Sequence, residues 1–536
     1  MIEPQQDHIW KSSKAGADLL CAMQDGMVTL ARYINTHAIP FLIATNYFTR
    51  VESRRAWMRT PWENLEAYLK LGSMNADIAN RAFQGGIQAA SQMMQSEIQS
   101  SLPALFSQNP RAFQQFSKRM VQLIKGVAHT YPAAIDGIEP EFGFHFEKQP
   151  PESKIDETDR FELYQVLPND NRTAVRPDGK PVLIIPPFVL GANILAFLPQ
   201  ERRSYAHAFA NQGIPTYIRI LKDIGASEAV QTMTPSDDAQ DTLQFCKKIM
   251  KRHGKAVTLN GYCQGGYSGL CNILSGKLDS VVDAFITCVS PMDGTRSKGL
   301  SAFLNELPTQ FNDLAYGTKT LANGNQVADG TLMGWIYKLK SIESEMPLLA
   351  MWRDMMIASS SNGNPSKISK TAAALNYWLT YERNDLPLEI TRMSFSSYNV
   401  PIQADGTLPV KLFDQPLNLK RLAAKKIPWL ICYGQHDDLV EPDTALAPLD
   451  YIDAEVSAFP KGHVAIATSW SHPDSDFALH TRFADGVTRG PVCFQLDLQR
   501  KLDDRRQSSS KKTARSTSES TKRSGKAISE PAKKKN

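Results

Sequence analysis

The segment VTLNGYCQGGYSGL, residues 257–270, constrains the fold of this chain more than any other part of the sequence. It combines an apolar, strand-like run with a glycine-flanked turn and the start of a helix. Cys263 occupies the turn, with Gly261 two residues before it and Gly265 two residues after it. A sharp strand–turn–helix junction of this kind holds a nucleophile above a sheet, and side chains in place of the two glycines would collide across the turn. The segment therefore predicts that Cys263 is a nucleophile.

The segments on either side of this turn alternate between strand-like and helix-like patterns. We expect strands at KPVLIIPPF, IPTYIRIL, KAVTLNGY and LDSVVDAFITCVSP, and a helix at PSDDAQDTLQFCKKIMKRH. The alternation stops after residue 293 and resumes at KKIPWLICYG and DAEVSAF. Where the alternating part begins, QPPESKIDETD is expected to be a linker and RFELYQVLP an edge strand. This pattern predicts an α/β fold with a mainly parallel sheet that helices cover on both faces.

The same patterns divide the chain into five parts. Residues 1–150 are predicted to form a helical N-terminal region, since TPWENLEAYLKLGSMNADIANRAFQGG has apolar residues at helical spacing. Residues 151–293 and 425–500 would form the two parts of the α/β core, with 294–424 inserted between them as a cap or lid. The apolar stripe of the N-terminal region is expected to pack on the same chain or on a partner subunit, with docking on a lipid-like surface as the alternative. Residues 507–536 are predicted to be a disordered basic tail.

This tail accounts for the net charge of the chain. Residues 507–536 contain nine lysines and arginines and two glutamates, whereas the whole chain has a formal net charge of +5. The remainder of the chain is therefore slightly acidic. We expect the tail to be a solvated, solubilising segment or, alternatively, to bind polyanions such as nucleic acid.

Cysteine usage and hydropathy indicate a cytoplasmic protein. The seven cysteines are scattered and form no CxxC pair, which argues against a disulfide framework and against a zinc site. The N-terminus has no signal-peptide layout, and no apolar run reaches the roughly 18 residues that span a bilayer. The sequence has no metal-ligand cluster and no dinucleotide-binding glycine pattern, so we expect neither a metal nor a redox cofactor.

An acid and a base for Cys263 follow later in the chain. Asp437 comes shortly after the strand-like run WLICYG, where the acid of such a turn is usually found, and its neighbour Asp438 stays open as a rival. His463 lies in a short glycine-containing loop after the next predicted strand, 26 residues beyond Asp437. His436, inside the acid loop, is expected to be exposed. The sequence therefore predicts a triad of Cys263, Asp437 and His463.

Two backbone N–H groups are expected to stabilise an oxyanion next to Cys263. Gln264 begins the helix after the nucleophile, so its N–H lies at the positive end of that helix. The second donor is expected in the loop after the strand VLIIPP, at Val189 or its neighbour Phe188.

Taken together, these motifs resemble those of the polyhydroxyalkanoate synthases, which carry a G-x-C-x-G-G turn in place of the G-x-S-x-G of lipases. Besides GYCQGG, the likeness rests on PVLIIPPFV, ILAFLPQERRSYAHAFANQGIPTYI, ITCVSPMD, NDLPLEITRMSFSSYNV, GQHDDLVEP and GHVAIA, and it covers residues 150–480. The resemblance implies an α/β-hydrolase fold with a cap insertion and a helical N-terminal region.

The resemblance also implies an activity and its partners. The chain would be an acyltransferase that polymerises (R)-3-hydroxyacyl-CoA into polyester through an acyl group bound to Cys263, with release of CoA. Asp437 and His463 would activate the 3-hydroxyl of an acyl unit. The implied partners are the growing polyester chain or the surface of a cytoplasmic polyester granule, and a second copy of the chain in a homodimer.

Two other functions stay open on the same residues. A cysteine-dependent hydrolase, either a thioesterase or an intracellular polyester depolymerase, would use the same triad and deliver the acyl group to water. A non-catalytic relative would bind granules or partners only. The synthase and the hydrolase differ in whether water reaches the acyl-enzyme, because hydrolysis competes with chain growth.

Overall fold

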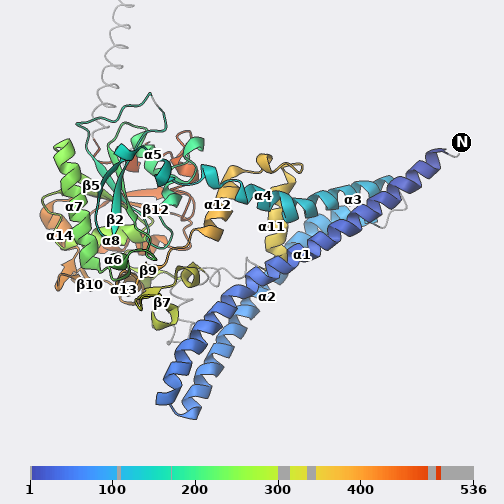
Figure 1. Ribbon diagram of the computed structural model, residues 1–536, viewed down its shortest axis with the longest axis horizontal. Coiled ribbons are helices and arrows are strands. Elements are labelled where there is room, and N and C mark those ends of the chain that lie inside the picture. Colours follow the sequence, from blue (N-terminus) through green and yellow to red (C-terminus); the bar gives the residue numbers. More distant parts are fainter. Residues whose placement is uncertain are drawn as a thin grey trace, which may run out of the picture.

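The computed structural model describes residues 3–105, 110–170, 172–299, 314–334, 346–480 and 490–496. An α/β body carries a long helical arm that projects away from it (Figure 1). The predicted basic tail at 507–536 lies outside the described residues, as does the end of the predicted core at 497–500.

An eight-stranded sheet forms the centre of the body, in the order β1-β2-β4-β3-β5-β6-β12-β13. β2 runs antiparallel to β1 and β4, and the other neighbouring strands are parallel. This strand order, with helices on both faces, is that of the α/β-hydrolase fold, so the predicted fold class is confirmed. The strands are Lys154–Glu157 (β1), Phe161–Val166 (β2), Val182–Ile185 (β3), Thr216–Leu221 (β4), Val257–Tyr262 (β5), Val282–Cys288 (β6), Trp429–Gly434 (β12) and Glu455–Phe459 (β13).

Helices of the body begin and end where local signals place them. The predicted acidic helix is α7, whose capping box joins Thr234 and Asp237 and whose end is marked by Gly254 at φ 67°. The helices of the body are Tyr205–Ala210 (α5), Glu228–Gln231 (α6), Pro235–His253 (α7), Gln264–Leu274 (α8), Lys420–Lys425 (α14) and Pro442–Ala445 (α15).

Alternate residues of the central strands contribute to two hydrophobic cores, one on each face of the sheet. Leu183 and Ile185 of β3 pack with residues of α7 and α8. Val182 and Ile184 of the same strand pack with residues of α5. All four side chains are fully buried, as the near-continuous apolar sequence of a strand covered on both faces predicts.

The predicted linker and edge strand need a correction. Part of the expected linker QPPESKIDETD forms β1, which pairs with β2, so the strand RFELYQVLP is not at the edge of the sheet. β1 consists of four residues, and three of them are charged. Short, charged strands are common at sheet edges because they discourage pairing with other chains, and such a sequence resembles a linker.

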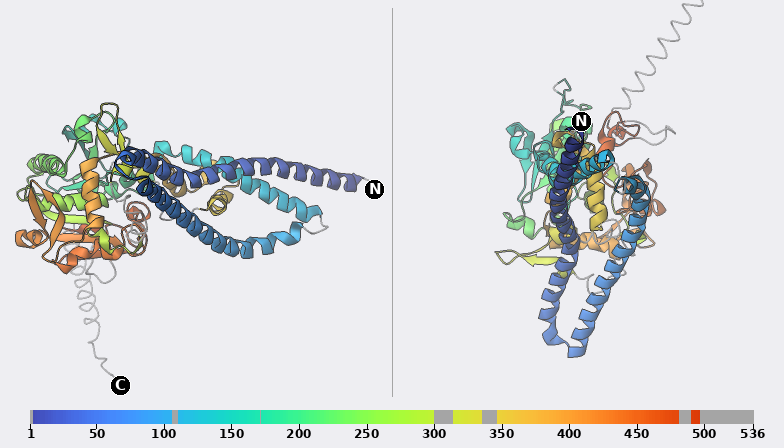
Figure 2. Two further views of the ribbon diagram at one scale, coloured as in Figure 1. Left: turned by 90° about the horizontal axis from the view of Figure 1, so that it is seen from below. Right: turned by 90° about the vertical axis from the view of Figure 1, so that its right-hand side faces the viewer.

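The arm is built from the N-terminal helices, as predicted. α1 (Glu3–Arg55) and α2 (Pro61–Leu105) form an antiparallel hairpin, α3 (Pro110–Lys125) packs along α1, and α4 (Tyr131–Asp136) leads toward the body (Figures 1 and 2). The apolar stripe of α2 is buried against Phe48 and Tyr316 of the same chain. None of the described helices holds a stretch long and apolar enough to cross a membrane.

Residues 294–424 separate β6 from β12 and connect the arm to the body. α11 and α12 lie against the arm, where the Tyr33 hydroxyl donates to Asp354 Oδ2 at 2.6 Å and Asn376 Nδ2 donates to the Tyr131 hydroxyl at 2.6 Å. α13 packs on the body. The elements of this insertion are Thr318–Thr320 (β7), Gln326–Ala328 (β8), Pro347–Ser359 (α11), Lys370–Tyr381 (α12), Leu386–Pro387 (β9), Leu388–Asn399 (α13), Thr407–Leu412 (β10) and Gln415–Asn418 (β11).

Candidate active site

The turn between β5 and α8 has the backbone conformation of a strained nucleophile turn. Cys263 adopts φ 51° and ψ −125°, a region that non-glycine residues rarely occupy. Its N–H donates to the carbonyl of Cys288 on the neighbouring strand at 2.8 Å, and its carbonyl accepts from the N–H of Gly266 at 2.9 Å. Hydrogen bonds on both sides therefore hold the thiol at the carboxyl end of β5.

The two flanking glycines are required for different reasons. A Cβ atom on Gly261 would lie 2.3 Å from Gly266 Cα, which is the collision across the turn that the sequence predicts. A Cβ atom on Gly265 would instead lie 2.3 Å from the carbonyl oxygen of Ile185, on β3. Gly265 is thus needed for close packing of α8 on the adjacent strand. The prediction that a side chain at this position would collide across the turn is therefore wrong for Gly265.

The structure brings Asp437 and His463 together at the same edge of the sheet. His463 Nδ1 and Asp437 Oδ2 are 2.8 Å apart, and both residues are buried. The other carboxylate oxygen of Asp437 accepts the N–H groups of Leu439 and Val440, each at 2.9 Å. Three hydrogen bonds therefore fix the orientation of the Asp437 carboxylate.

The rival residues lie elsewhere. Asp438 is exposed, whereas the carboxylate bonded to His463 is that of the buried Asp437. His436 is exposed, as predicted. A Cβ atom on Gly434 would come within 2.6 Å of the carbonyl oxygen of Lys461, which explains the glycine at the end of β12, where the acid and base loops cross.

His463 also lies close to Cys263. Burial by itself lowers the pKa of His463, but interactions with the Asp437 carboxylate and with the Cys263 sulfur outweigh burial and raise the pKa well above its ordinary value. Nε2 of His463 is buried and has no hydrogen-bond partner among the described residues, which leaves it available to the nearby thiol. The backbone of His463 is fixed by Tyr262, whose hydroxyl donates to its carbonyl at 2.9 Å. Tyr262 directly precedes Cys263 in the sequence. Its hydrogen bond to His463 joins positions 201 residues apart and was not predicted from the sequence.

Of the two predicted oxyanion donors, Val189 contacts the side chain of the other, Gln264. Gln264 is the first residue of α8, so its backbone N–H has no acceptor within the helix. The Val189 N–H donates to Gln264 Oε1 at 3.4 Å, and Gln264 Nε2 donates to Ser394 Oγ of α13 at 2.5 Å. In this conformation the Gln264 side chain, rather than an open space, faces the Val189 N–H.

The loop that carries Val189, residues 186–193 after β3, is held by the insertion. Asn384 Nδ2 donates to the Phe188 carbonyl at 3.4 Å, and Trp378 Nε1 donates to the Leu190 carbonyl at 3.3 Å. These contacts join positions nearly 200 residues apart, and no local motif in the sequence announces them. They show that the insertion sets the position of a candidate donor loop.

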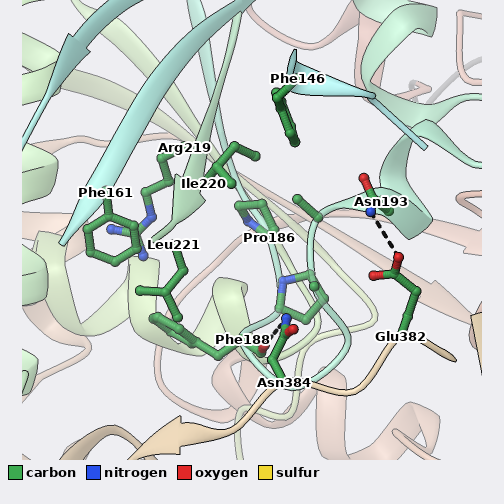
Figure 3. A pocket seen from close by; sticks show the side chains of 13 residues that line it. Phe146, Phe161, Pro186, Phe188, Asn193, Arg219, Ile220, Leu221, Glu382 and Asn384 are labelled. Atoms are coloured by element: carbon green, nitrogen blue, oxygen red, sulfur yellow. Dashed lines mark hydrogen bonds between the residues drawn. The ribbon is translucent and has the colours of Figure 1, made fainter. Parts of the chain in front are cut away.

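A cavity of about 210 Å³ lies where this loop meets the insertion (Figure 3). Phe188, Asn193, Glu382 and Asn384 line it, and Cys263 does not. Asn193 Nδ2 donates to Glu382 Oε1 at 3.0 Å, so these two lining side chains point toward one another (Figure 3). Burial raises the pKa of Glu382 above its ordinary value, and the hydrogen bond from Asn193 opposes this effect. Among the residues that the structure describes, no group of three or more histidine, cysteine, aspartate or glutamate side chains could hold a metal ion.

Comparisons with known proteins find matches among solved structures only. No protein-family model matches the chain, and no curated protein matches its sequence. Similar solved structures include a thermophilic esterase from Thermogutta terrifontis (12% identity, 59% of this chain, 92% of that chain, TM-score 0.29). They also include the thioesterase domain from the curacin biosynthetic pathway (13% identity, 59% of this chain, 94% of that chain, TM-score 0.33). A third is 2-hydroxy-6-oxo-6-phenylhexa-2,4-dienoate hydrolase from Rhodococcus sp. strain RHA1 (13% identity, 59% of this chain, 93% of that chain, TM-score 0.32). Identities and scores this low carry no information on activity or substrate.

Proposed function

We propose that the chain is a polyhydroxyalkanoate synthase-like acyltransferase that uses Cys263 as its nucleophile. The observation that supports this most is the arrangement of a cysteine in a strained turn near a histidine whose Nδ1 is 2.8 Å from Asp437. The order of these residues in the chain, nucleophile then acid then base, is that of α/β-hydrolase triads. The resemblance of the motifs around them to the synthase family supplies the substrate class.

Acyl loading would begin with proton transfer from the Cys263 thiol to His463. The thiolate attacks the carbonyl carbon of a 3-hydroxyacyl-CoA thioester, a carbon–sulfur bond forms to Cys263, and the bond to the CoA sulfur breaks. His463 returns the proton to the departing CoA thiolate. The backbone N–H of Gln264 would stabilise the oxyanion, and the Val189 N–H would join it once the Gln264 side chain moves aside.

Chain extension would use the same histidine as a base. His463 takes the proton of the 3-hydroxyl of an acyl unit, and the hydroxyl oxygen attacks the acyl group on Cys263. An ester bond forms, the bond to Cys263 breaks, and the cysteine sulfur recovers the proton. Exchange between thioesters is close to thermoneutral, so sulfur suits a residue that is loaded and unloaded repeatedly.

The test is to incubate the purified protein with (R)-3-hydroxybutyryl-CoA and to measure CoA and acyl products together. CoA release with an insoluble polyester is the expected result, and the Cys263→Ala variant should release none. CoA release with free 3-hydroxybutyrate would replace the proposal with the hydrolase. No CoA release across several acyl lengths would reject both activities.

A further inference from the structure

The end of the α1–α2 hairpin carries the three most exposed large apolar side chains among the described residues. Trp57 is 93% exposed, Met58 is 81% exposed and Trp62 is 71% exposed. They lie in and directly after the short turn that joins the two helices, at the end of the hairpin farthest from the N-terminus of α1 (Figures 1 and 2). We call this set, together with Leu65 and Leu69, the hairpin tip.

The hairpin tip continues along one face of α2. Leu65 is 48% exposed and Leu69 is 61% exposed. They follow Trp62 by three and seven residues, so the three side chains share a face of the helix. At a rise of about 1.5 Å per residue this face is about 10 Å long. A hairpin that enters a lipid layer end-on would bury it at a depth close to the about 5–10 Å that apolar helix faces reach at the headgroup boundary.

The charges around the hairpin tip favour an anionic surface. Residues 50–70 contain five basic and three acidic side chains. Each acidic group is already engaged within the hairpin: Glu52 pairs with Arg59, Glu63 accepts the Thr60 N–H at 2.7 Å, and Glu66 pairs with Lys70 at 2.9 Å. Arg54 is exposed and has no ion-pair partner among the described residues, so positive charge is left over beside the tip.

The shape of the hairpin tip fits a lipid layer better than a protein partner. A stable protein interface buries about 800 Å² on each partner, whereas the end of a two-helix hairpin is narrow and convex. Tryptophan is enriched where headgroups meet acyl chains, and flanking arginines gain energy from anionic headgroups. We propose that the hairpin tip inserts into the headgroup region of anionic phospholipid bilayers. This inference is independent of the reaction at Cys263.

The experiment measures binding of the full-length protein to vesicles. Vesicles of phosphatidylglycerol and phosphatidylcholine should bind the protein and those of phosphatidylcholine alone should bind it at least about tenfold more weakly, because each basic residue near the surface contributes to attraction. The triple variant Trp57→Ser, Met58→Ser, Trp62→Ser should lose about a hundredfold in affinity for the anionic vesicles. Vesicles with brominated acyl chains should quench tryptophan emission of the wild type and leave that of the variant unchanged.

The matched control changes other exposed apolar residues of the same arm. The triple variant Leu20→Ser, Met27→Ser, Leu42→Ser replaces side chains that are 63–67% exposed on α1 and should bind anionic vesicles as the wild type does. Circular dichroism should show equal helix content in all three proteins. Absence of vesicle binding by the wild type, unchanged binding by the tip variant, or equal loss in both variants would overturn the proposal. A tip variant that changes only the sedimentation coefficient would identify a second copy of the chain as the occupant and would also overturn it.

Discussion

The α/β body buries its apolar side chains more completely than the helical arm does. Every residue of β3 is fully buried, because helices cover both faces of the sheet. The arm is a thin layer of helices, so Leu20 and Met27 of α1 and Trp57 of the turn after it are more than 60% exposed. The body therefore surrounds the candidate active site with buried side chains, whereas the arm leaves large apolar side chains exposed. The proposed chemistry thus lies in the body and the proposed membrane contact in the arm, and this division can be tested region by region.

The largest expected effect is on the chemistry of the body. Cys263→Ala should abolish transfer of an acyl group from a 3-hydroxyacyl-CoA to the protein, because no other nucleophile occupies the turn. Mass spectrometry of the intact protein after mixing would measure the loading. Loading of the variant at the wild-type rate would show that the body does not contain the proposed nucleophile. Serine substitutions in the arm provide the matched comparison and should leave loading unchanged.

The next effect separates two neighbouring carboxylates within the body. Asp437→Asn should slow chain extension by about a hundredfold or more, because it removes the carboxylate that orients His463 and stabilises its protonated form. Acyl loading should fall less than chain extension. Asp438→Asn is the control, since its side chain is exposed. A larger loss in Asp438→Asn than in Asp437→Asn would show that the acid is misassigned.

The stability of the body should depend on a buried ion pair whose arginine lies over the ring of Phe188, in the 186–193 loop. Arg219 Nη1 and Asp238 Oδ1 are 2.6 Å apart, and both side chains are 1% exposed. Asp238→Asn leaves the guanidinium without its counter-charge and should lower the free energy of unfolding by about 3–5 kcal/mol. Leu42→Ser in the arm should change it by less than about 0.5 kcal/mol. Urea denaturation measures both, and equal losses would remove the contrast between body and arm.

The pH dependence of stability should carry the signature of His463. Its pKa in the folded protein is raised, so the protonated form stabilises the fold. This contribution is fully present below the unfolded pKa of about 6.5 and is lost as the pH rises through the folded pKa. The difference in unfolding free energy between the wild type and His463→Gln should therefore shrink as the pH is raised from 6 upward. A difference that grows with pH would contradict the raised pKa.

The smallest effect concerns the joint between arm and insertion. Tyr33→Phe removes the hydrogen bond to Asp354 and should cost about 1 kcal/mol of stability. Hydrogen exchange should report faster opening of α1 and α11, with unchanged protection of β3 and β5. Faster exchange throughout the body would show that the two regions unfold as one unit.

The sequence predicted the parts of the site that depend on local pattern. The turn at Cys263, the acid after β12 and the base after β13 each follow a strand end, and parallel strands bring such ends to one edge of a sheet. The hydrogen bonds from Trp378 and Asn384 to the 186–193 loop were not predictable, since they depend on how the insertion docks. β1 was missed because its charged residues carry no strand pattern. The roles of Val189 and of the basic tail stay predictions.

Helix α12 connects two distant sites through a single turn. Asn376 donates to Tyr131 of the arm, and Trp378, two residues later, donates to the Leu190 carbonyl beside the candidate active site. Residues this close on a helix move as a unit. Helix α12 therefore links the arm directly to the 186–193 loop, so a partner that displaced the arm would be expected to displace this loop as well.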